Sequence, residues 1–235
     1  MINPNNPGNW FTDLNGDFDL NGSNAFKCWN NASLVWYWLC DNLSKYGGGK
    51  PSIKSCAGLL ANMYIESTVN PNLWEWYFNQ SAHDPWSNGY GLVQWSPMIL
   101  DYVSYQVGIP GTWANYDQIR AYAQAHPDEW QANGPQQMRQ LLYEATHNLQ
   151  WAGNSNATQS GLPATPPFTM LQFFSDTNYS AWDYGEAWLW YYERPASPTI
   201  GQRGTYARDV FLPYLESLPP WRKGMPVYMM MNYRR

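Results

Sequence analysis

Apolar side chains recur at steps of three and four residues along much of this chain of 235 residues, which is the period of an amphipathic helix. The first such run starts at Asn31 and ends before the glycine triplet at 47–49. Ser52 then suits the N-cap of a second helix, whose apolar stripe ends near Glu66. The pattern predicts further helices over residues 98–107, 115–125, 135–151 and 204–217, and one or two over 168–194.

Segments without this period separate the helices. Residues 1–30 are rich in Asn, Gly and Pro and predict an extended arm, while residues 70–100 hold four Trp and predict an irregular loop with a short hairpin. The low-complexity stretch 153–167 predicts a surface loop or a lid. We therefore expect a mainly α-helical, single globular domain over residues 31–218 with a small irregular or hairpin lobe, an arm over 1–30 and an extended tail over 219–235.

Composition supports a folded chain with a large core. Hydrophobic residues make up 44% of the sequence and charged residues 13%, too few for a disordered polymer. The 15 Trp and 18 Tyr suit both stacking on sugar rings and packing in a core or an interface, and we expect most of them in the core. The net charge of −5 argues against binding to nucleic acid, although it permits a glycan substrate.

The first residues have neither a basic region nor an apolar stretch, so we expect no secretory signal there. No segment reaches the roughly 20 apolar residues of a membrane span. The three cysteines, Cys28, Cys40 and Cys56, match no zinc spacing. We expect them to be reduced and buried, with a Cys28–Cys40 or Cys40–Cys56 disulfide as the alternative.

The segment 17–22 matches the first half of a calcium-binding loop, in which alternate oxygen ligands precede a glycine. The second half fails, because Cys28 stands where such a loop needs a glutamate. The segment therefore favours an Asx-type turn over an ion site.

Candidate chemistry is concentrated in two motifs, Glu66-Ser67-Thr68-Val69-Asn70-Pro71 and Gly89-Tyr90-Gly91-Leu92-Val93-Gln94-Trp95. Cleavage of a glycosidic bond needs a carboxylic acid that keeps its proton in a partly apolar cleft. Glu66 has this setting, because it ends an amphipathic helix whose C-terminal dipole disfavours ionisation. We expect the pKa of Glu66 to be raised.

The second motif suits a sugar-binding turn. A glycine such as Gly91 lets the backbone approach a substrate closely, and Tyr90 and Gln94 could add directed hydrogen bonds. Trp95 could stack on a sugar ring, with the other tryptophans of the loop, Trp74, Trp76 and Trp86, as alternatives. Each feature alone is common in proteins, and the hypothesis depends on their occurring together.

These paired motifs resemble the phage tail lysozyme family and, more distantly, goose-type lysozymes and lytic transglycosylases. A later segment, Tyr191-Tyr192-Glu193-Arg194-Pro195 followed by Arg203, Tyr206 and Ala207, is similar to the end of the tail lysozyme domain. The resemblance covers residues 31–215 and implies a lysozyme-like α+β fold. It also implies that Glu66 is the catalytic acid, that Gln94 and the 89–91 turn lie in the sugar cleft, and that Glu193 pairs with an arginine to hold the fold.

A second catalytic carboxylate is less well defined. An inverting hydrolase needs one about 6.5–9.5 Å from the acid, and goose-type enzymes carry one just before the glycine turn, near Asp84 of this chain. Their further aspartate, two residues after the glutamine, is replaced here by Ser96. The resemblance therefore also permits a transglycosylase route, in which a hydroxyl of the sugar replaces water.

The implied function is a lysozyme of a phage tail that cuts the β-1,4 bond between N-acetylmuramic acid and N-acetylglucosamine. Its expected partners are peptidoglycan glycan strands and other tail proteins, its expected place is the virion, and no cofactor or metal is implied.

Two alternatives stay open. A catalytically silent tail component could use the Asn-rich start and the basic, Met-rich end for docking. A peptidase or amidase is disfavoured, because His83, His126 and His147 have no ligand-like spacing, and Cys40 and Cys56 lie on apolar faces of expected helices.

Overall fold

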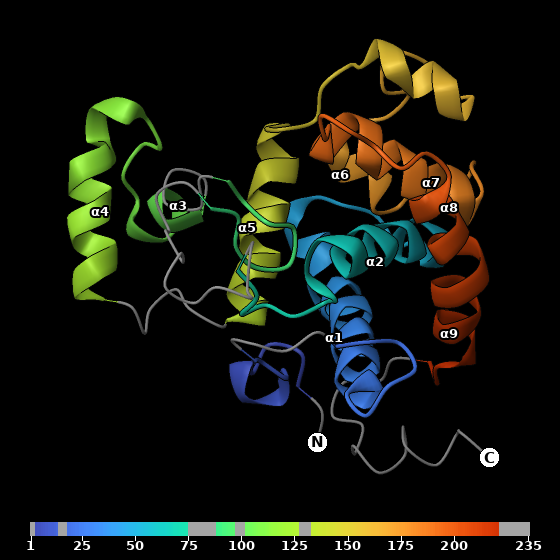
Figure 1. The fold of residues 1–235 in the computed structure, drawn as a ribbon, viewed down its shortest axis with the longest axis horizontal. Helices are drawn as coiled ribbons and strands as arrows, with labels where there is room; N and C mark the ends of the chain where they lie inside the picture. Colours follow the sequence, from blue (N-terminus) through green and yellow to red (C-terminus); the bar gives the residue numbers. More distant parts are fainter. Residues whose placement is uncertain (1–2, 14–17, 75–87, 97–101, 127–132, 221–235) are drawn as a thin grey trace.

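The computed structural model describes residues 3–13, 18–74, 88–96, 102–126 and 133–220 (Figure 1). Its helices are α1 (Ala25–Asn42), α2 (Ile53–Ser67), α3 (Ser104–Val107), α4 (Tyr116–Ala125), α5 (Gly134–His147), α6 (Met170–Phe173), α7 (Ala181–Trp188), α8 (Gln202–Tyr206) and α9 (Leu212–Ser217). Pairing of β type within these ranges is limited to two antiparallel bridges, Trp74 with Tyr90 and Tyr90 with Trp95. The expected mainly helical domain with a small hairpin-like loop is confirmed.

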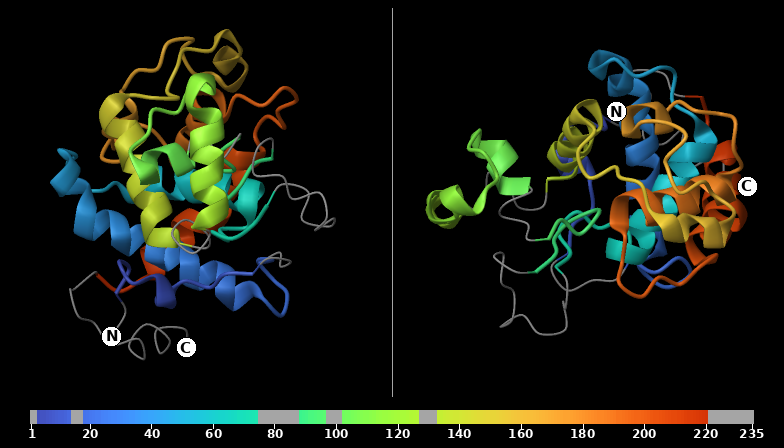
Figure 2. Two further views of the ribbon diagram at one scale, coloured as in Figure 1. Left: turned by 90° about the vertical axis from the view of Figure 1, so that its left-hand side faces the viewer. Right: turned by 90° about the horizontal axis from the view of Figure 1, so that it is seen from above.

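Helix α2 is the centre of the body. It lies across α1 and packs against α7, α8 and α9, which form one side of the molecule in Figure 1. Helices α3 and α4 lie beyond α5, on the side away from α7 to α9, and two views show α4 standing apart from the main body (Figures 1 and 2). The proposed catalytic residue Glu66 is therefore at the end of the central helix.

Glycines allow α2, α7 and α8 to approach one another closely. A Cβ on Gly58 of α2 would lie 2.6 Å from the backbone carbon of Tyr184, and one on Gly185 would lie 2.7 Å from the carbonyl oxygen of Arg203. Asn62 joins the same crossing, because its Nδ2 donates to the carbonyls of Gly58 (2.8 Å) and Gly185 (2.9 Å). The backbones of α2 and α8 thus each lie close against α7, with little space for adjustment.

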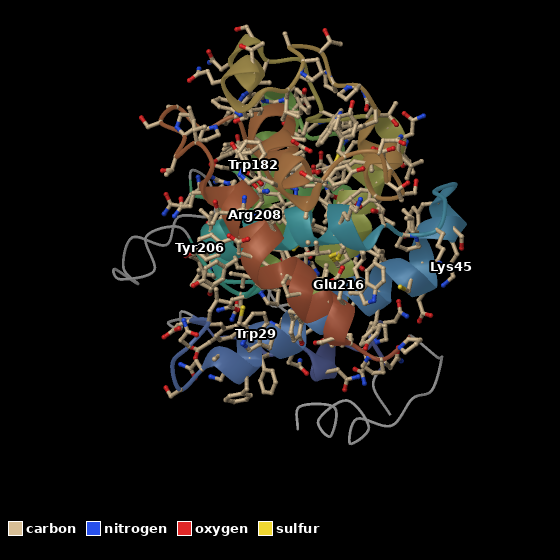
Figure 3. All side chains as sticks on the ribbon, turned by 90° about the vertical axis from the view of Figure 1, so that its right-hand side faces the viewer. Trp29, Lys45, Trp182, Tyr206, Arg208 and Glu216 are labelled. Atoms are coloured by element: carbon tan, nitrogen blue, oxygen red, sulfur yellow. The ribbon has the colours of Figure 1, made fainter. Side chains whose placement is uncertain are left out.

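Two helices continue through π-helical turns. The α7 helix runs on as Leu189–Glu193, and α8 runs through Ala207–Phe211 into α9. Figure 3 shows α9 and the turn before it crossing in front of α2. Tyr214 of α9 packs on Trp29 of α1, with ring centroids 4.5 Å apart, so the end of the domain covers its first helix.

The second predicted helix is confirmed, including its cap. Ser52 accepts a hydrogen bond from the backbone N–H of Ser55, and α2 ends at Ser67. The first helix begins at Ala25, earlier than predicted, because Cys28 and Trp29 already pack against the core in helical register. The helix predicted over 135–151 ends at His147, where the next residue adopts a left-handed conformation.

Other predicted segments agree with the structure in kind. The helices expected at 115–125 and 204–217 are present, and the described part of 98–107 contains α3. The stretch 153–167 holds the short 3-10 helix Ser155–Ser160 and is largely exposed, as expected of a surface loop. No helix within the described ranges has both the length and the apolar character to cross a membrane.

The described parts of the N-terminal segment pack against the body. The Trp10 side chain is 5% exposed and lies against Gly134 of α5, and Phe18 is fully buried in the common core. Asp19 Oδ1 accepts from the backbone N–H of Asn21 at 2.5 Å, which is an Asx-type turn, although Asp17 lies outside the described residues. The boundary at residues 30 and 31 stays a prediction, as does the tail, because residues 221–235 are also outside them.

All three cysteines are described and free of disulfides. Burial raises the pKa of the Cys28 and Cys40 thiols to about 12 and that of Cys56 well above its ordinary range. The thiols are therefore neutral and poorly nucleophilic at physiological pH, which disfavours a cysteine peptidase.

Candidate active site

Glu66 is the penultimate residue of α2, and its side chain emerges from a largely buried helix. The side chain is 22% exposed, so its carboxyl is neither free in solvent nor sealed in the core. This partial exposure is what a group needs if it is to exchange a proton with a bound substrate.

Ser67 joins the end of α2 to the glycine-containing turn. Its buried hydroxyl lies 2.9 Å from the carbonyl oxygen of Met63 in the same helix and 3.0 Å from that of Leu92 in the turn. The residue after Glu66 therefore sets the position of the second motif relative to the first.

The chain leaves α2 through two left-handed residues, Thr68 (φ 53°) and Val69 (φ 59°). Such a backbone is unfavourable for a β-branched residue and costs about 1–3 kcal/mol. Backbone hydrogen bonds from Thr68 to Tyr64 (2.8 Å) and from Val69 to Met63 (3.2 Å) hold it in place. The turn directs the chain away from the helix axis immediately after Glu66.

The 89–95 turn is closed by backbone bonds between Tyr90 and Trp95, at 3.2 and 3.1 Å. Gly91 has a φ of 80°, and a Cβ there would lie 2.5 Å from Oε1 of Gln137. Gln137, on α5, accepts from the N–H of Leu92 (2.9 Å) and donates to the carbonyl of Pro71 (2.6 Å). The glycine is required so that this buried glutamine can join the two motifs.

Gln94 faces inward within the same turn. Its Nε2 donates to the carbonyls of Leu73 and Gly91, both at 3.0 Å. Its Oε1 is buried and has no hydrogen-bond partner within the described part of the chain. The amide therefore supports the turn with its nitrogen, while its oxygen is an acceptor that a ligand could reach only if the turn rearranged.

The aromatic residues of the turn are core residues in this structure. Tyr90 is fully buried and donates to Oδ1 of Asn72 at 3.0 Å, and Trp95 is 4% exposed and donates to Oε1 of Glu144 at 2.8 Å. Neither ring presents a face to a sugar here, so a direct contact with substrate remains a prediction that requires the rings to be uncovered. Asp84 and the alternative stacking residues Trp76 and Trp86 lie outside the described residues, and Trp74 is buried.

Arg203 of α8 makes an ion pair with Glu66. The arginine is 5% exposed, and the α2–α7–α8 crossing described above sets its position. The sequence suggested an arginine partner for Glu193, but the ion pair that Arg203 forms is with Glu66. A guanidinium in contact with a carboxyl favours its ionised form, which opposes a general acid in the resting state.

Glu193 ends the π-helical turn after α7 and accepts a hydrogen bond from Nε1 of Trp188 at 2.9 Å. Burial and then the nearby charge of Glu66 raise the pKa of Glu193 well above its usual range, and Glu144 raises it further. The hydrogen bond from Trp188 and the charge of Arg203 act in the opposite direction. Glu193 therefore favours the protonated state.

Glu144, on α5, is a buried acceptor that the sequence analysis did not single out. Its carboxyl accepts from Nε1 of Trp95 (2.8 Å), Nε2 of Gln140 (2.9 Å) and the hydroxyl of Tyr192 (2.7 Å). It thereby links the turn to the π-helical segment. The available signal was its spacing, because it lies three residues after Leu141 and thus on the apolar face of the predicted helix.

The described part of the site thus includes the partly exposed carboxyl of Glu66, the Glu193 carboxyl, which favours its proton, and the Arg203 guanidinium. Such a group of side chains can hold a proton and deliver it to a bound oxygen. Within the same ranges, His, Cys, Asp and Glu form no cluster of three or more that could hold a metal ion.

Comparison with known proteins places this arrangement in a family. The profile of the phage tail lysozyme family matches residues 43–214, which include Glu66, the glycine turn, Glu193 and Arg203. The chain belongs to the phage tail lysozyme family. Family membership agrees with the mainly helical, lysozyme-like fold and confirms the resemblance drawn from the motifs.

One curated relative is Morphogenesis protein 1 of Bacillus phage B103. It is 30% identical over 188 residues, which cover 80% of this chain and 41% of that protein. The chain therefore spans about two fifths of the length of this relative.

Proposed function

We propose that this chain is a phage glycosidase that cuts the glycan strands of peptidoglycan, with Glu66 as the general acid. The bond would be the β-1,4 linkage between N-acetylmuramic acid and N-acetylglucosamine. The observation that carries the proposal is the partly exposed Glu66 side chain at the end of a buried helix, joined through Ser67 to the glycine turn. Membership of the phage tail lysozyme family supports the same substrate class.

In this mechanism Glu66 gives its proton to the glycosidic oxygen as the bond to the sugar carbon breaks. The 91–94 turn would lie along the glycan, and Oε1 of Gln94, which is buried here, would accept from an acetamido N–H once the turn opens to the substrate. Tyr90 and Trp95 would support the turn from the core, and they would contact the substrate only if its binding uncovers their rings.

The fate of the sugar carbon depends on a second group. Asp84 is our candidate for the carboxylate that activates water in a hydrolase. A transglycosylase route would instead use a hydroxyl of the muramyl sugar and would need Glu66 alone. No cofactor enters either route.

We further propose that the protein acts from the virion, in or near the tail, where it opens the host wall locally so that DNA can enter. Other tail proteins would be its partners. The name of its relative in phage B103, a morphogenesis protein, suits a virion-associated role.

The experiment is digestion of purified peptidoglycan sacculi by the whole chain, with mass spectrometry of the products. Glu66→Gln should lower the rate by about 100-fold or more, the usual contribution of a general acid. Glu216→Gln is the matched control, because Glu216 is exposed on α9 (Figure 3). Hydrolysed ends would indicate a hydrolase, and anhydro ends a transglycosylase.

The proposal fails if Glu66→Gln digests sacculi as fast as the wild-type protein, or if peptide bonds are cut in place of glycosidic ones. The second candidate function is a silent tail component that binds glycan without cutting it. The ion pair between Arg203 and Glu66 favours this reading, because it stabilises the carboxylate over the acid. Binding to sacculi with no soluble product would support it.

A further inference from the structure

Glu186, on α7, is a buried carboxyl that takes no direct part in the proposed mechanism. We propose that it is a positioning residue of the site: it fixes the start of α8 from within the core, and thereby holds the Arg203 guanidinium against Glu66. This inference rests on the proposed function of Glu66 as the general acid.

Both carboxyl oxygens of Glu186 accept hydrogen bonds from the backbone at the start of α8. Oε2 accepts from the N–H of Gly201, the N-cap residue, at 3.1 Å, and Oε1 accepts from the N–H of Gly204 at 3.0 Å. Since Gly201 has no side chain with which to cap the helix, Glu186 supplies the acceptor that Ser or Asp would normally provide. Arg203 lies between the two donors, so the residue that meets Glu66 is fixed from both sides along the chain.

The Glu186 carboxyl is itself held by a buried polar network. Ser160 Oγ donates to Oε2 of Glu186 at 2.7 Å, and Nε1 of Trp190 donates to Ser160 Oγ at 2.8 Å. Ser160 ends the 3-10 helix Ser155–Ser160, and Trp190 lies in the π-helical turn after α7. A buried network in which each member has its partner is rigid, so Glu186 has a defined orientation that it can impose on α8.

Close packing restrains the same part of α8 in the opposite direction. A Cβ on Gly185 would lie 2.7 Å from the carbonyl oxygen of Arg203, and a Cβ on Gly204 would lie 2.5 Å from Cδ1 of Trp182. These contacts prevent α8 from moving towards α7, while the two hydrogen bonds to Glu186 prevent it from moving away. Without the bonds, the start of α8 has only one of these two restraints.

The restraint on α8 has a chemical consequence at Glu66. The Nη2 of Arg203 is in the ion pair with Glu66, and a guanidinium beside a carboxyl stabilises its ionised form. The distance between the two groups therefore affects the pH at which Glu66 gives up its proton. Since Glu186 is 0% exposed, it cannot touch a glycan, and its effect on the reaction must pass through α8.

The test variant is Glu186→Gln, which keeps the length of the side chain. An amide has one acceptor oxygen in place of two, so its NH2 group must face the N–H of Gly201 or that of Gly204. One bond to α8 is then replaced by a contact between two donors. Ser160→Ala is the matched control, because it removes a hydrogen bond from the same carboxyl and leaves both bonds to α8 in place.

The first experiment does not depend on turnover. The side-chain carboxyl carbon of Glu66 is titrated by carbon-13 NMR in the whole chain. In Glu186→Gln the pKa of Glu66 should rise by about 0.5–1 pH unit, a part of the 1–3 units that a close guanidinium contributes. It should stay at the wild-type value in Ser160→Ala. The charge of Glu193 also interacts with that of Glu66, and Glu193 is present in all of these chains.

A double-mutant cycle decides whether Glu186 acts through Arg203. Arg203→Gln should raise the pKa of Glu66 by itself, and adding Glu186→Gln should then cause little further change, because no cation is left to displace. An equal effect of Glu186→Gln with and without Arg203 overturns the inference, as does an unchanged pKa of Glu66 in the single variant.

Glu186→Asp replaces Glu186→Gln if the latter does not fold. It keeps the carboxylate, but with one methylene fewer it cannot reach both backbone N–H groups. We expect a smaller rise in the pKa of Glu66 in the same direction, and an unchanged value would overturn the inference.

The second experiment is the pH dependence of sacculus digestion. In Glu186→Gln the alkaline limb of kcat should move up by about 0.5–1 pH unit with KM nearly unchanged, because Glu66 keeps its proton to a higher pH. A merely structural role would lower the resistance to urea, as we expect for Ser160→Ala, without moving the limb.

The outcomes separate the two proposals. If the wild-type chain cuts no glycan, the proposed function fails, while the NMR titration still decides whether Glu186 positions Arg203. If Glu66→Gln is inactive and Glu186→Gln keeps both the wild-type limb and the wild-type pKa of Glu66, the proposed function stands and the positioning role is refuted.

Discussion

The hydroxyl of Ser67 is the smallest group on which the geometry of the site depends. It is fully buried and lies within hydrogen-bond distance of carbonyls in α2 and in the glycine turn. Ser67→Ala should lower the free energy of unfolding by about 1 kcal/mol, since the hydrogen bond from the hydroxyl is lost and a buried carbonyl is left without its donor. Glycan cleavage should fall by more than this loss of stability accounts for, because the turn is no longer held beside Glu66.

The measurement is urea unfolding together with digestion of sacculi. Ser217→Ala is the matched control, because this exposed serine makes a comparable bond to a carbonyl in its own helix, at 2.6 Å. Equal effects of the two substitutions on digestion would contradict the role given to Ser67.

Glu193 also links protonation to folding. Its pKa is raised in the folded chain, so the native state binds the proton more tightly than the unfolded state does. This contribution to stability is fully present below the unfolded value of about 4.3 and is lost as pH rises through the higher folded value. Urea unfolding at pH 5 and pH 8 should therefore show a decline in the wild-type chain that is smaller in Glu193→Gln. An identical decline in both would show that another group is responsible.

At the scale of elements, the crossing of α2 and α7 determines where the end of α2, and so Glu66, is placed. A methyl group at Gly58 would meet the backbone of Tyr184, which cannot move as a side chain can. Gly58→Ala should therefore lower the free energy of unfolding by about 1–3 kcal/mol, as overpacking of a core does, and should displace Glu66 from Arg203. Gly8→Ala is the control, since its nearest contact would be an ordinary 3.4 Å. Chemical denaturation and sacculus digestion measure both effects, and a Gly58→Ala chain as stable as the control would show that the crossing can adjust.

The elements also show what the sequence could and could not predict. Helix α2, its cap at Ser52 and its end near Glu66 follow from local periodicity and capping chemistry, and these were predicted correctly. The π-helical turns at Leu189–Glu193 and Ala207–Phe211 were not, because the extra residue of such a turn shifts the apolar pattern by a single position, too little to recognise in runs this short. One of these turns places Glu193 in the site.

Long-range polar contacts were equally hidden. Arg203 meets Glu66 across 137 positions, and Gln137 meets Leu92 across 45 positions. Motifs could indicate that Glu66 and the glycine turn belong together, but no spacing rule indicates which distant side chain completes the site. The role of the aromatic residues could not be predicted either. A tryptophan that could stack on a sugar could equally well pack in the core, and Trp95 lies in the core here.

At the scale of the whole molecule, the N-terminal segment shares the core of the domain. The Trp10 side chain packs against Gly134 of α5, and its Nε1 donates to the carbonyl of Pro4 at 3.1 Å. Trp10→Ala should lower the free energy of unfolding by about 3 kcal/mol or more, as large truncations in a core do. Phe26→Ala is the matched control, because Phe26 is 53% exposed, and it should change stability by well under 1 kcal/mol. Thermal or urea unfolding measures both effects. A Trp10→Ala chain as stable as the wild-type protein would favour the extended N-terminal arm that the sequence predicted.

The distance along the chain between Glu66 and Arg203 also has a consequence for synthesis. A ribosome that has translated the acid must add 137 more residues before the cation that faces it exists. Since domains fold as units and chains grow at about 5–20 residues per second, roughly 7 to 27 seconds separate the two events. Nascent chains that stop between residues 95 and 202 contain both sequence motifs and yet lack the counter-ion, so a prematurely terminated product would carry an incomplete candidate site.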